Sequence, residues 1–494
     1  MLSPLLLLGA AAFLITGHLV IQRILFARRA AALGCGKAPM YKHKDPILGL
    51  DLAFTTFRAI ANNTLLDLFT SIFEEYGNTY AVNTLGQTTI MTNESENFKA
   101  ILTRIEDWPI AGLRLYATLP VLGPKSVFSS NGQLWHSARA LIRPSFVRDQ
   151  VTDLKCFDRH ISNLLAVLPR DGSTFDLQMY IVAMTMDSST DFMMGYSTNS
   201  LVEPAPEAQQ FLRDFEYAAI EGAKIAILGS ILNYIPHRKL QAAVQRMRAY
   251  LRSHLKAIIA AKKKSEEING DRSYVFLDEV LKAMSDEEYV VDQMLSILVA
   301  GRDTTAAAMT AAFYFLTRDP KAVEKLRTEI KDLGVKNPSW DQLKGMKYLN
   351  NVVKEALRLF PPVAVNSREA SKEVVLPVGG GPDGKQPILV AKGTSVRYST
   401  WHLQRRKDTY GPDADEFRPE RWDNLRVGWE YTPFSGGPRI CIGQQFALTQ
   451  IAYTLYKFFN TFKAIEPREF RPLEAAQALT ISFANGCMVG LTPE

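Results

Sequence analysis

The sequence contains few cysteines and no strong excess of charge of either sign. Four of its 494 residues are cysteines, and no two of them form a C-x-x-C pair, which excludes a disulfide-stabilised scaffold. The 57 basic and 51 acidic side chains leave a net charge of +6, a mildly basic balance that does not indicate a nucleic-acid partner. The hydrophobic fraction of 47% excludes a disordered chain and is typical of a globular protein.

Charged residues are also absent from the first turns of the chain. Residues 2–22 carry no Asp, Glu, Lys or Arg, and about 20 apolar residues in a helix can cross a bilayer core. Basic residues follow directly at Arg23, Arg28 and Arg29, which favours a cytoplasmic location for what comes next and argues against a cleaved signal peptide. We predict a transmembrane anchor over residues 1–27 in the endoplasmic reticulum membrane, with the rest of the chain in the cytoplasm. A buried core helix is the alternative.

Residues 28–50 are basic and proline-bearing and are predicted to be a linker. The remainder, 51–494, contains no repeat, no low-complexity tract and no internal linker, which favours one large domain although the length alone suggests several. Helical periodicity dominates 134–360, and a helix is expected over 443–463. Alternating apolar segments predict strands within 78–92, 374–398 and 478–492. The predicted fold is therefore mainly α with small peripheral sheets (α+β).

One cysteine lies in a distinctive loop, FSGGPRICIG at residues 434–443. Gly436 and Gly437 let the backbone turn sharply and approach a flat cofactor closely. A predicted helix begins just after Cys441, so its sulfur faces unpaired N–H groups and the positive end of the helix dipole, which favour the thiolate. Arg439 supplies a cation for an anionic group such as a haem propionate. A thiolate here would be a soft, strongly donating metal ligand.

Three further segments combine polar residues at helical spacing. The run AGRDTT (300–305) interrupts an apolar helix predicted over 288–318, where Thr hydroxyls can bond backward to helix carbonyls; a polar stripe on a surface helix is the alternative. Glu355 and Arg358 share a helix face at i,i+3, a pair that is worth little when solvated. Trp135 and Arg139, four residues apart, also share a face.

The ordered set W-x-x-x-R, A-G-x-D-T-T, E-x-x-R, P-E-R and F-x-x-G-x-R-x-C-x-G resembles the cytochrome P-450 monooxygenases over residues 135–443. The resemblance implies their fold, and it implies that Cys441 is the axial ligand of a haem iron. It also implies that Asp303 and Thr304 are catalytic in oxygen activation, and that Arg421 joins Glu355 and Arg358 in a buried structural triad. The further cofactor-binding positions that it implies are Trp135, Arg139, Arg368, Phe434, Gly437, Arg439 and Gly443.

The resemblance implies haem b (iron protoporphyrin IX) as cofactor and NADPH as the electron source. No G-x-G-x-x-G motif opens a β–α–β unit, so we expect a separate NADPH-dependent reductase as partner. The stretches 375–394 and 399–422 resemble fungal alkane and fatty-acid hydroxylases, which implies hydroxylation of a long-chain alkane or fatty acid. Pathway-specific oxidation of a lipid-like secondary metabolite (a polyketide or terpenoid) is an alternative. A non-oxygenating haem-thiolate isomerase and a haem sensor are two further alternatives.

Positions that match the family's substrate contacts are mostly apolar. An apolar lining favours a hydrophobic small-molecule substrate, because unpaired polar groups are costly to bury there. Arg114 could meet a substrate carboxylate or could be a surface or haem-side charge. The expected wall residues are Leu113, Tyr116, Leu119, Leu122, Ile297, Ala300, Val363, Val365 and Phe483.

Overall fold

The computed structural model describes residues 4–147, 152–228, 237–266 and 286–493. Helices dominate this part of the chain and small sheets accompany them, so the predicted mainly α fold is confirmed. The α-helices are α1 (Pro4–Ala32), α2 (Leu50–Ala61), α3 (Leu65–Tyr76), α4 (Ser95–Thr103), α5 (Gly112–Leu122), α6 (Gly132–Ile142), α8 (Lys155–Val167), α9 (Leu177–Met194), α10 (Pro206–Leu228), α11 (Arg238–Glu266), α13 (Glu287–Arg318), α14 (Pro320–Leu333), α15 (Trp340–Gly345), α16 (Lys347–Leu359), α17 (Thr400–Leu403), α18 (Lys407–Tyr410), α19 (Arg421–Asn424) and α20 (Gln444–Phe459). The strands are β1 (Thr79–Thr84), β2 (Gln87–Thr92), β3 (Phe175–Asp176), β4 (Val365–Glu369), β5 (Val374–Gly380), β6 (Gln386–Val390), β7 (Ser395–Ser399), β8 (Phe462–Pro467), β9 (Ala475–Gln477), β10 (Ile481–Phe483) and β11 (Met488–Pro493).

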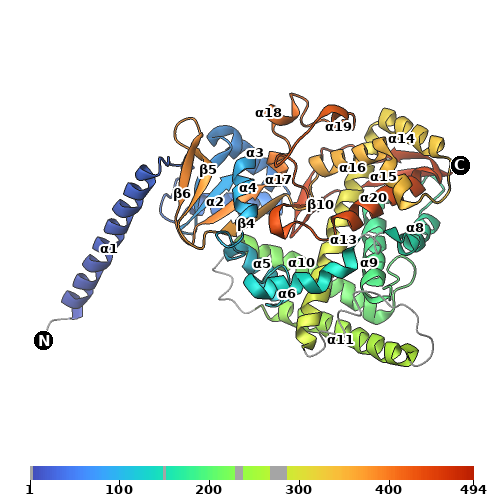
Figure 1. The fold of residues 1–494 in the computed structure, drawn as a ribbon, viewed down its shortest axis with the longest axis horizontal. Helices are drawn as coiled ribbons and strands as arrows, with labels where there is room; N and C mark the ends of the chain where they lie inside the picture. Colours follow the sequence, from blue (N-terminus) through green and yellow to red (C-terminus); the bar gives the residue numbers. More distant parts are fainter. Residues whose placement is uncertain (1–3, 148–151, 229–236, 267–285, 494) are drawn as a thin grey trace.

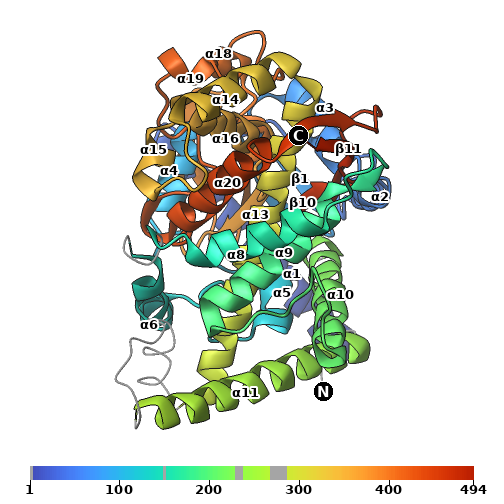
Figure 2. The ribbon, with the colours of Figure 1, turned by 90° about the vertical axis from the view of Figure 1, so that its right-hand side faces the viewer.

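Helix α13 passes through the middle of the helical part in both views (Figures 1 and 2). Its N-cap Asp286 accepts a hydrogen bond from the backbone N–H of Tyr289, which satisfies one of the donors left unpaired at a helix start. Both ends of the helix are largely buried, and its neighbours include α9 and α16. A helix that is apolar on nearly all sides belongs in a core, and the helix predicted over 288–318 is confirmed.

A four-stranded sheet with the order β1-β2-β7-β4 accompanies the helices. Its hairpin β1–β2 is antiparallel, and its turn residues Leu85 and Gly86 have φ angles of 52° and 77°, as a two-residue hairpin turn requires. The hairpin predicted over 78–92 is therefore confirmed. Strand β7 runs parallel to β2 and antiparallel to β4, so it is an interior strand of the sheet. Its successive side chains point to opposite faces of the sheet.

The N-terminal helix α1 extends away from the rest of the molecule (Figure 1). Near its end, Arg29 pairs with Glu373, and beyond it the Gly36 N–H donates to the Pro387 carbonyl at 2.8 Å. Within the described residues, no helix combines the length and hydropathy required for a membrane span. The transmembrane anchor over 1–27 stays a prediction.

Candidate active site

A cavity of about 260 Å³ lies between α13 and the loop that precedes α20. Its walls come from segments that are far apart in the sequence, namely α6, α13, β4, β7 and residues 432–447. Of the ten site residues expected from the sequence, eight line this cavity and Asp303 and Gly437 do not. The eight are Trp135, Arg139, Thr304, Arg368, Phe434, Arg439, Cys441 and Gly443.

The loop that carries Cys441 is held by backbone contacts. The N–H of Cys441 donates to the carbonyl of Phe434 at 3.0 Å, which closes the loop on itself. Gly437 has a φ of +65°, and a Cβ there would lie 2.2 Å from the carbonyl oxygen of Leu102 at the end of α4. Glycine is thus required at this position both for its backbone conformation and for the close approach to α4. Although Gly437 does not line the cavity, it fixes the loop that presents Cys441.

The ionisation of Cys441 differs from the sequence-based expectation. Its side chain is exposed, but the space that it faces is the cavity. Burial raises the pKa of the Cys441 thiol, and the Gly443 N–H and the Arg139 guanidinium lower it by less. The expectation that the helix start favours the thiolate is therefore wrong in its net direction, because desolvation of sulfur outweighs the local positive groups. A coordinated metal ion deprotonates a thiol outright, so the donor atom fits a metal ligand.

Four arginine side chains gather on this cavity without an acidic partner. Arg114, Arg139, Arg368 and Arg439 line it, and no Asp or Glu is among its described lining residues. Burial, together with the nearby charge of Arg368, lowers the pKa of Arg114 and that of Arg439 to about 9. Unpaired buried charge is costly, so the cluster fits an anionic group. The two propionates of haem supply such a group, and the lining therefore fits haem. Arg114 belongs to this cluster.

The arginine groups are held by neutral partners and by aromatic packing. Arg439 donates through Nη2 to the Ser130 carbonyl at 3.0 Å and to Asn131 Oδ1 at 3.1 Å. Its guanidinium carbon lies 4.3 Å from the ring centroid of Trp135, a cation–π distance. Arg114 donates to Asn366 Oδ1 at 2.6 Å. Neutral partners orient the cations and leave their charge available to a ligand.

Thr304 and Asp303 occupy different surroundings although they are neighbours on α13. Thr304 faces the cavity, and its Oγ1 donates to the Ala300 carbonyl at 2.5 Å, the backward bond expected from the sequence. Asp303 accepts from Arg302 Nη1 at 3.0 Å. Burial raises the pKa of the Asp303 carboxyl, whereas Arg302 lowers it. The structure thus places Thr304 at the cavity wall, whereas Asp303 does not line the cavity.

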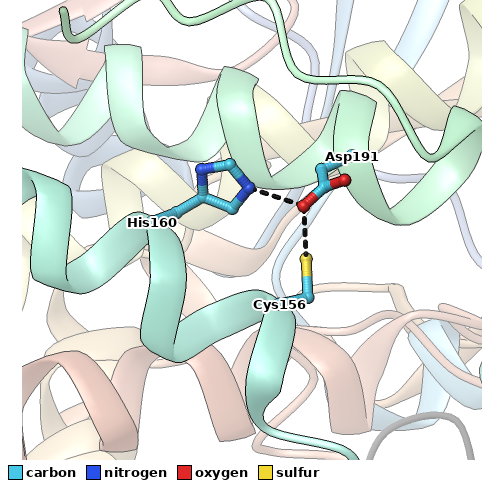
Figure 3. Close-up of side chains that lie close together, drawn as sticks. All are labelled: Cys156, His160 and Asp191. Atoms are coloured by element: carbon cyan, nitrogen blue, oxygen red, sulfur yellow. Dashed lines mark hydrogen bonds and ion pairs between the residues drawn. The ribbon is translucent and has the colours of Figure 1, made fainter.

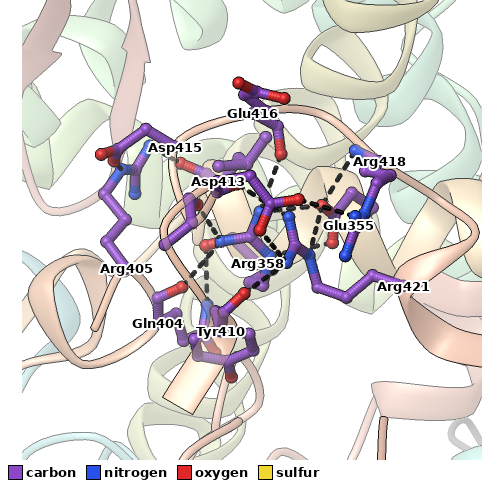
Figure 4. Close-up of polar contacts among 12 residues, drawn as sticks. Glu355, Arg358, Gln404, Arg405, Tyr410, Asp413, Asp415, Glu416, Arg418 and Arg421 are labelled. Atoms are coloured by element: carbon purple, nitrogen blue, oxygen red, sulfur yellow. Dashed lines mark hydrogen bonds and ion pairs between the residues drawn. The ribbon is translucent and has the colours of Figure 1, made fainter. Parts of the chain in front are cut away.

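The Glu355–Arg358 pair is a buried network and not a solvated surface contact (Figure 4). Both side chains have zero exposure, and Arg358 makes two hydrogen bonds of 2.8 Å to the Glu355 carboxylate. Arg421 reaches the same carboxylate at 3.3 Å, and Trp422 donates to it at 2.9 Å. The triad implied by the resemblance is present.

Gln404 extends this network to the cysteine loop. Its amide nitrogen donates to the carbonyls of Leu357 and Arg358 at 3.0 Å each, and its amide oxygen accepts from the Thr432 N–H at 3.0 Å. Thr432 itself lines the cavity. Gln404 therefore ties the end of α16 to the start of the loop. Sequence reasoning missed it, because no local spacing relates position 404 to either segment.

A second cavity of about 240 Å³ adjoins the first, and both are lined by Ala300, Thr304 and Val363. Of the expected substrate contacts, Leu122, Ile297, Ala300, Val363 and Val365 line one or both cavities. The turn from Gln477 to Thr480 also lines the second cavity; the sequence signal for it was a strand-like tail with no further detail.

Three of the expected substrate contacts line neither of these two cavities. Leu119 on α5 is exposed, and Tyr116 is partly buried and packs against a core cluster. Phe483 stacks on Phe360 at 4.2 Å between ring centroids and is buried in the core. The side chain of Leu113 lies outside the described part of the structure.

A separate group of titratable side chains joins α8 to α9 (Figure 3). Asp191 accepts from His160 Nε2 at 2.9 Å, from Arg159 at 2.9 Å and from the thiol of Cys156 at 3.6 Å. The ligand atoms of Cys156, His160 and Asp191 lie close enough to one another to hold a metal ion. The Arg159 guanidinium, however, already neutralises the carboxylate, so the group acts as a polar clamp between the two helices.

Comparison with known proteins agrees with this geometry. The family model of cytochrome P450 matches residues 46–482. The chain is 37% identical to cytochrome P450 monooxygenase himC of Aspergillus japonicus, over 95% of this chain and 87% of that protein. It is 38% identical to cytochrome P450 monooxygenase fsdH of Fusarium heterosporum (98% and 88% covered) and 34% identical to cytochrome P450 52A13 of Debaryomyces hansenii (97% and 96%). A cysteine on a glycine-bearing loop, a cavity lined by unpaired arginines and a buried Glu–Arg–Arg network thus occur in a chain that belongs to the cytochrome P450 family, as a haem-thiolate monooxygenase.

Proposed function

We propose that this monooxygenase hydroxylates a long, apolar, lipid-like substrate, an alkane or a fatty acid. The observation that carries the proposal is the second cavity, whose walls are mainly apolar and which reaches Thr304 beside the cysteine cavity. Burial of an extended hydrocarbon there would remove apolar surface from water at about 25 cal/mol per Å². A polar metabolite would leave its hydrogen-bonding groups unpaired against these walls.

Each group of residues has a task in this proposal. Cys441 ligates the iron, and the arginine cluster binds the propionates. Bound haem supplies the oxidation, in which one oxygen atom of O2 enters a C–H bond of the substrate and the other leaves as water, with two electrons and two protons. Thr304 holds a hydroxyl proton at the cavity wall. Asp303, which does not line the cavity and whose pKa is raised by burial, is suited to resupply protons to Thr304.

Electron supply and location complete the proposal. We propose that an NADPH-dependent reductase delivers the electrons and that the segment 1–27 anchors the protein in the endoplasmic reticulum membrane. Deletion of residues 1–27 should move the protein from the membrane pellet to the supernatant after cell lysis. If the truncated protein still sediments with membranes after a carbonate wash, the anchor assignment is wrong.

The decisive experiment measures substrate-binding difference spectra of the full-length holoenzyme with alkanes, fatty acids, polyketides and terpenoids. Saturable spectral shifts with long-chain alkanes or fatty acids, followed by hydroxylated product with NADPH, reductase and O2, are the expected result. Selective binding of a polyketide or terpenoid would instead assign the enzyme to a secondary-metabolite pathway. Turnover without NADPH and O2 would indicate an isomerase, and binding without consumption would indicate a sensor.

A further inference from the structure

Two arginines line the second cavity, Arg114 of the arginine cluster and Arg397. Unlike Arg114, Arg397 does not line the cysteine cavity. It lies on β7 next to Tyr398, which does line the cysteine cavity. Because successive side chains of a strand point to opposite faces, Arg397 and Tyr398 lie on opposite sides of the sheet. Arg397 therefore faces away from the proposed haem carboxylates.

The guanidinium of Arg397 has no counter-charge. Among the described residues, none forms a hydrogen bond or an ion pair with it, and no Asp or Glu lines the second cavity. Burial lowers the pKa of Arg397, and the group that opposes this shift is the phenol of Tyr80 rather than a carboxylate. A desolvated cation of this kind costs stability unless a ligand pairs with it.

Neutral polar groups surround this cation on the same face of the sheet. The register pairs Tyr80 with Met91, Met91 with Arg397, and Arg397 with Ser367, and directly opposite residues share a face. The hydroxyl of Tyr80 is buried and has no hydrogen-bond partner in the described structure. Ser367 lines the second cavity. Glu369 lies on the same face two residues from Ser367, but it does not line the second cavity. An anion bound at Arg397 within this cavity would therefore meet the Ser367 hydroxyl and no acidic lining residue.

The rest of the second cavity is suited to a hydrocarbon. Leu65, Phe69, Leu122 and Val365 lie along its walls, and Thr304 marks the part shared with the cysteine cavity. A ligand bound in this cavity could contact both Arg397 and Thr304. Arg397 thus shares an apolar space with a residue of the cysteine cavity.

We propose that Arg397 binds the carboxylate of a long-chain fatty acid and holds the remote end of the chain toward Cys441. This inference rests on the proposed lipid hydroxylation and specifies it, since it selects the acid over the alkane. Carboxylate binding at Arg397 sets which carbon lies at the iron, so that oxidation occurs far from the carboxyl group. Arg397 is in this sense a determinant of substrate choice and of the position of hydroxylation.

The test compares hexadecanoic acid with its methyl ester, which has the same chain but no charge, on the full-length holoenzyme. Wild type should bind the acid at least about tenfold more tightly than the ester, as expected for a charge-assisted hydrogen bond. Arg397→Met should weaken binding of the acid about 10- to 100-fold, leave binding of the ester unchanged and scatter the positions of hydroxylation on the acid. Arg397→Lys should recover part of the affinity for the acid. The exposed Lys392→Met, five residues earlier, serves as the charge-matched control and should change neither.

The outcomes separate this inference from the function on which it rests. If wild type binds acid and ester equally, or if Arg397→Met weakens both equally, lipid hydroxylation stands and the carboxylate site is overturned. If neither ligand binds to wild type, the proposed function fails, and the carboxylate site fails with it. Haem content and the thermal unfolding midpoint should not fall in Arg397→Met, because the substitution removes an unpaired, partly buried charge. A variant that loses haem would show that Arg397 is structural.

Discussion

Substitution of Gly437 by alanine should loosen the loop that presents Cys441. The residue has a φ of +65°, a conformation that costs a residue with a Cβ about 1–2 kcal/mol. The new Cβ would also lie 2.2 Å from the carbonyl oxygen of Leu102, and relief of such overpacking costs about 1–3 kcal/mol. Together the two effects amount to about 2–5 kcal/mol, and a shift of the loop away from α4 would relieve both. We therefore expect weaker haem retention and misplacement of the sulfur.

The assay is haem content per chain, together with the fraction of the reduced carbon monoxide complex that has thiolate character. The matched control is Gly428→Ala, since Gly428 has an ordinary φ and its Cβ would meet its nearest atom at 3.6 Å. Gly437→Ala should lose most of the thiolate-type complex, whereas Gly428→Ala should keep it. Full haem content and a normal spectrum in Gly437→Ala would refute the argument, because the loop would then have another way to accommodate a side chain.

Three further substitutions test other parts of the structure. Glu355→Gln leaves Arg358 buried without a counter-charge, so it should destabilise the protein by about 3–5 kcal/mol, measured by urea unfolding of the holoprotein; an unchanged midpoint would contradict a buried ionic network. Thr304→Ala removes the hydroxyl at the cavity wall and should lower product formed per NADPH about tenfold or more, with substrate affinity unchanged; full coupling would remove Thr304 from proton supply. Burial opposes ionisation of Asp191, but His160 and other donors hold its pKa below the usual range, so its stabilisation is present above about pH 4 and is lost as the pH falls through the lowered value. Asp191→Asn should therefore be less stable than wild type at pH 7 and should approach it below pH 4, and a difference independent of pH would show that charge is not involved.

The sequence predicts those features of this fold that depend on neighbouring residues. The hairpin turn at Leu85-Gly86 can be predicted because two strand-like runs flank it. Helix α13 can be predicted because its apolar run is long. The hydrogen bond from Thr304 to the Ala300 carbonyl follows from the spacing of four residues along one helix. The loop around Cys441 can be predicted because its residues stand at fixed offsets in the sequence. In the structure most of them line one cavity.

Features that depend on segments distant in sequence are not predictable in this way. Phe483 was expected in the substrate pocket, yet its side chain lies in the core and the preceding turn meets the cavity. Because strand side chains alternate in direction, the register of a short tail decides which residues face inward. The pKa of Cys441 depends on burial by the whole fold, which no local pattern of charges reveals. The link made by Gln404 joins three separate segments, and its position in the sequence has no distinguishing feature.

The distribution of positive charge gives the clearest physical reason for assigning two different ligands to this site. A single cluster of arginines would be explained by one anionic cofactor. Arg368 and Tyr398 lie on one face of the β4–β7 pair, whereas Ser367 and Arg397 lie on the other. A group that neutralises Arg368 is thus separated from Arg397 by the sheet itself. On the proposed carboxylate site, the unpaired charge on the second face would pair with a second anion, and the apolar cavity beside it would favour an anion with a long hydrocarbon chain.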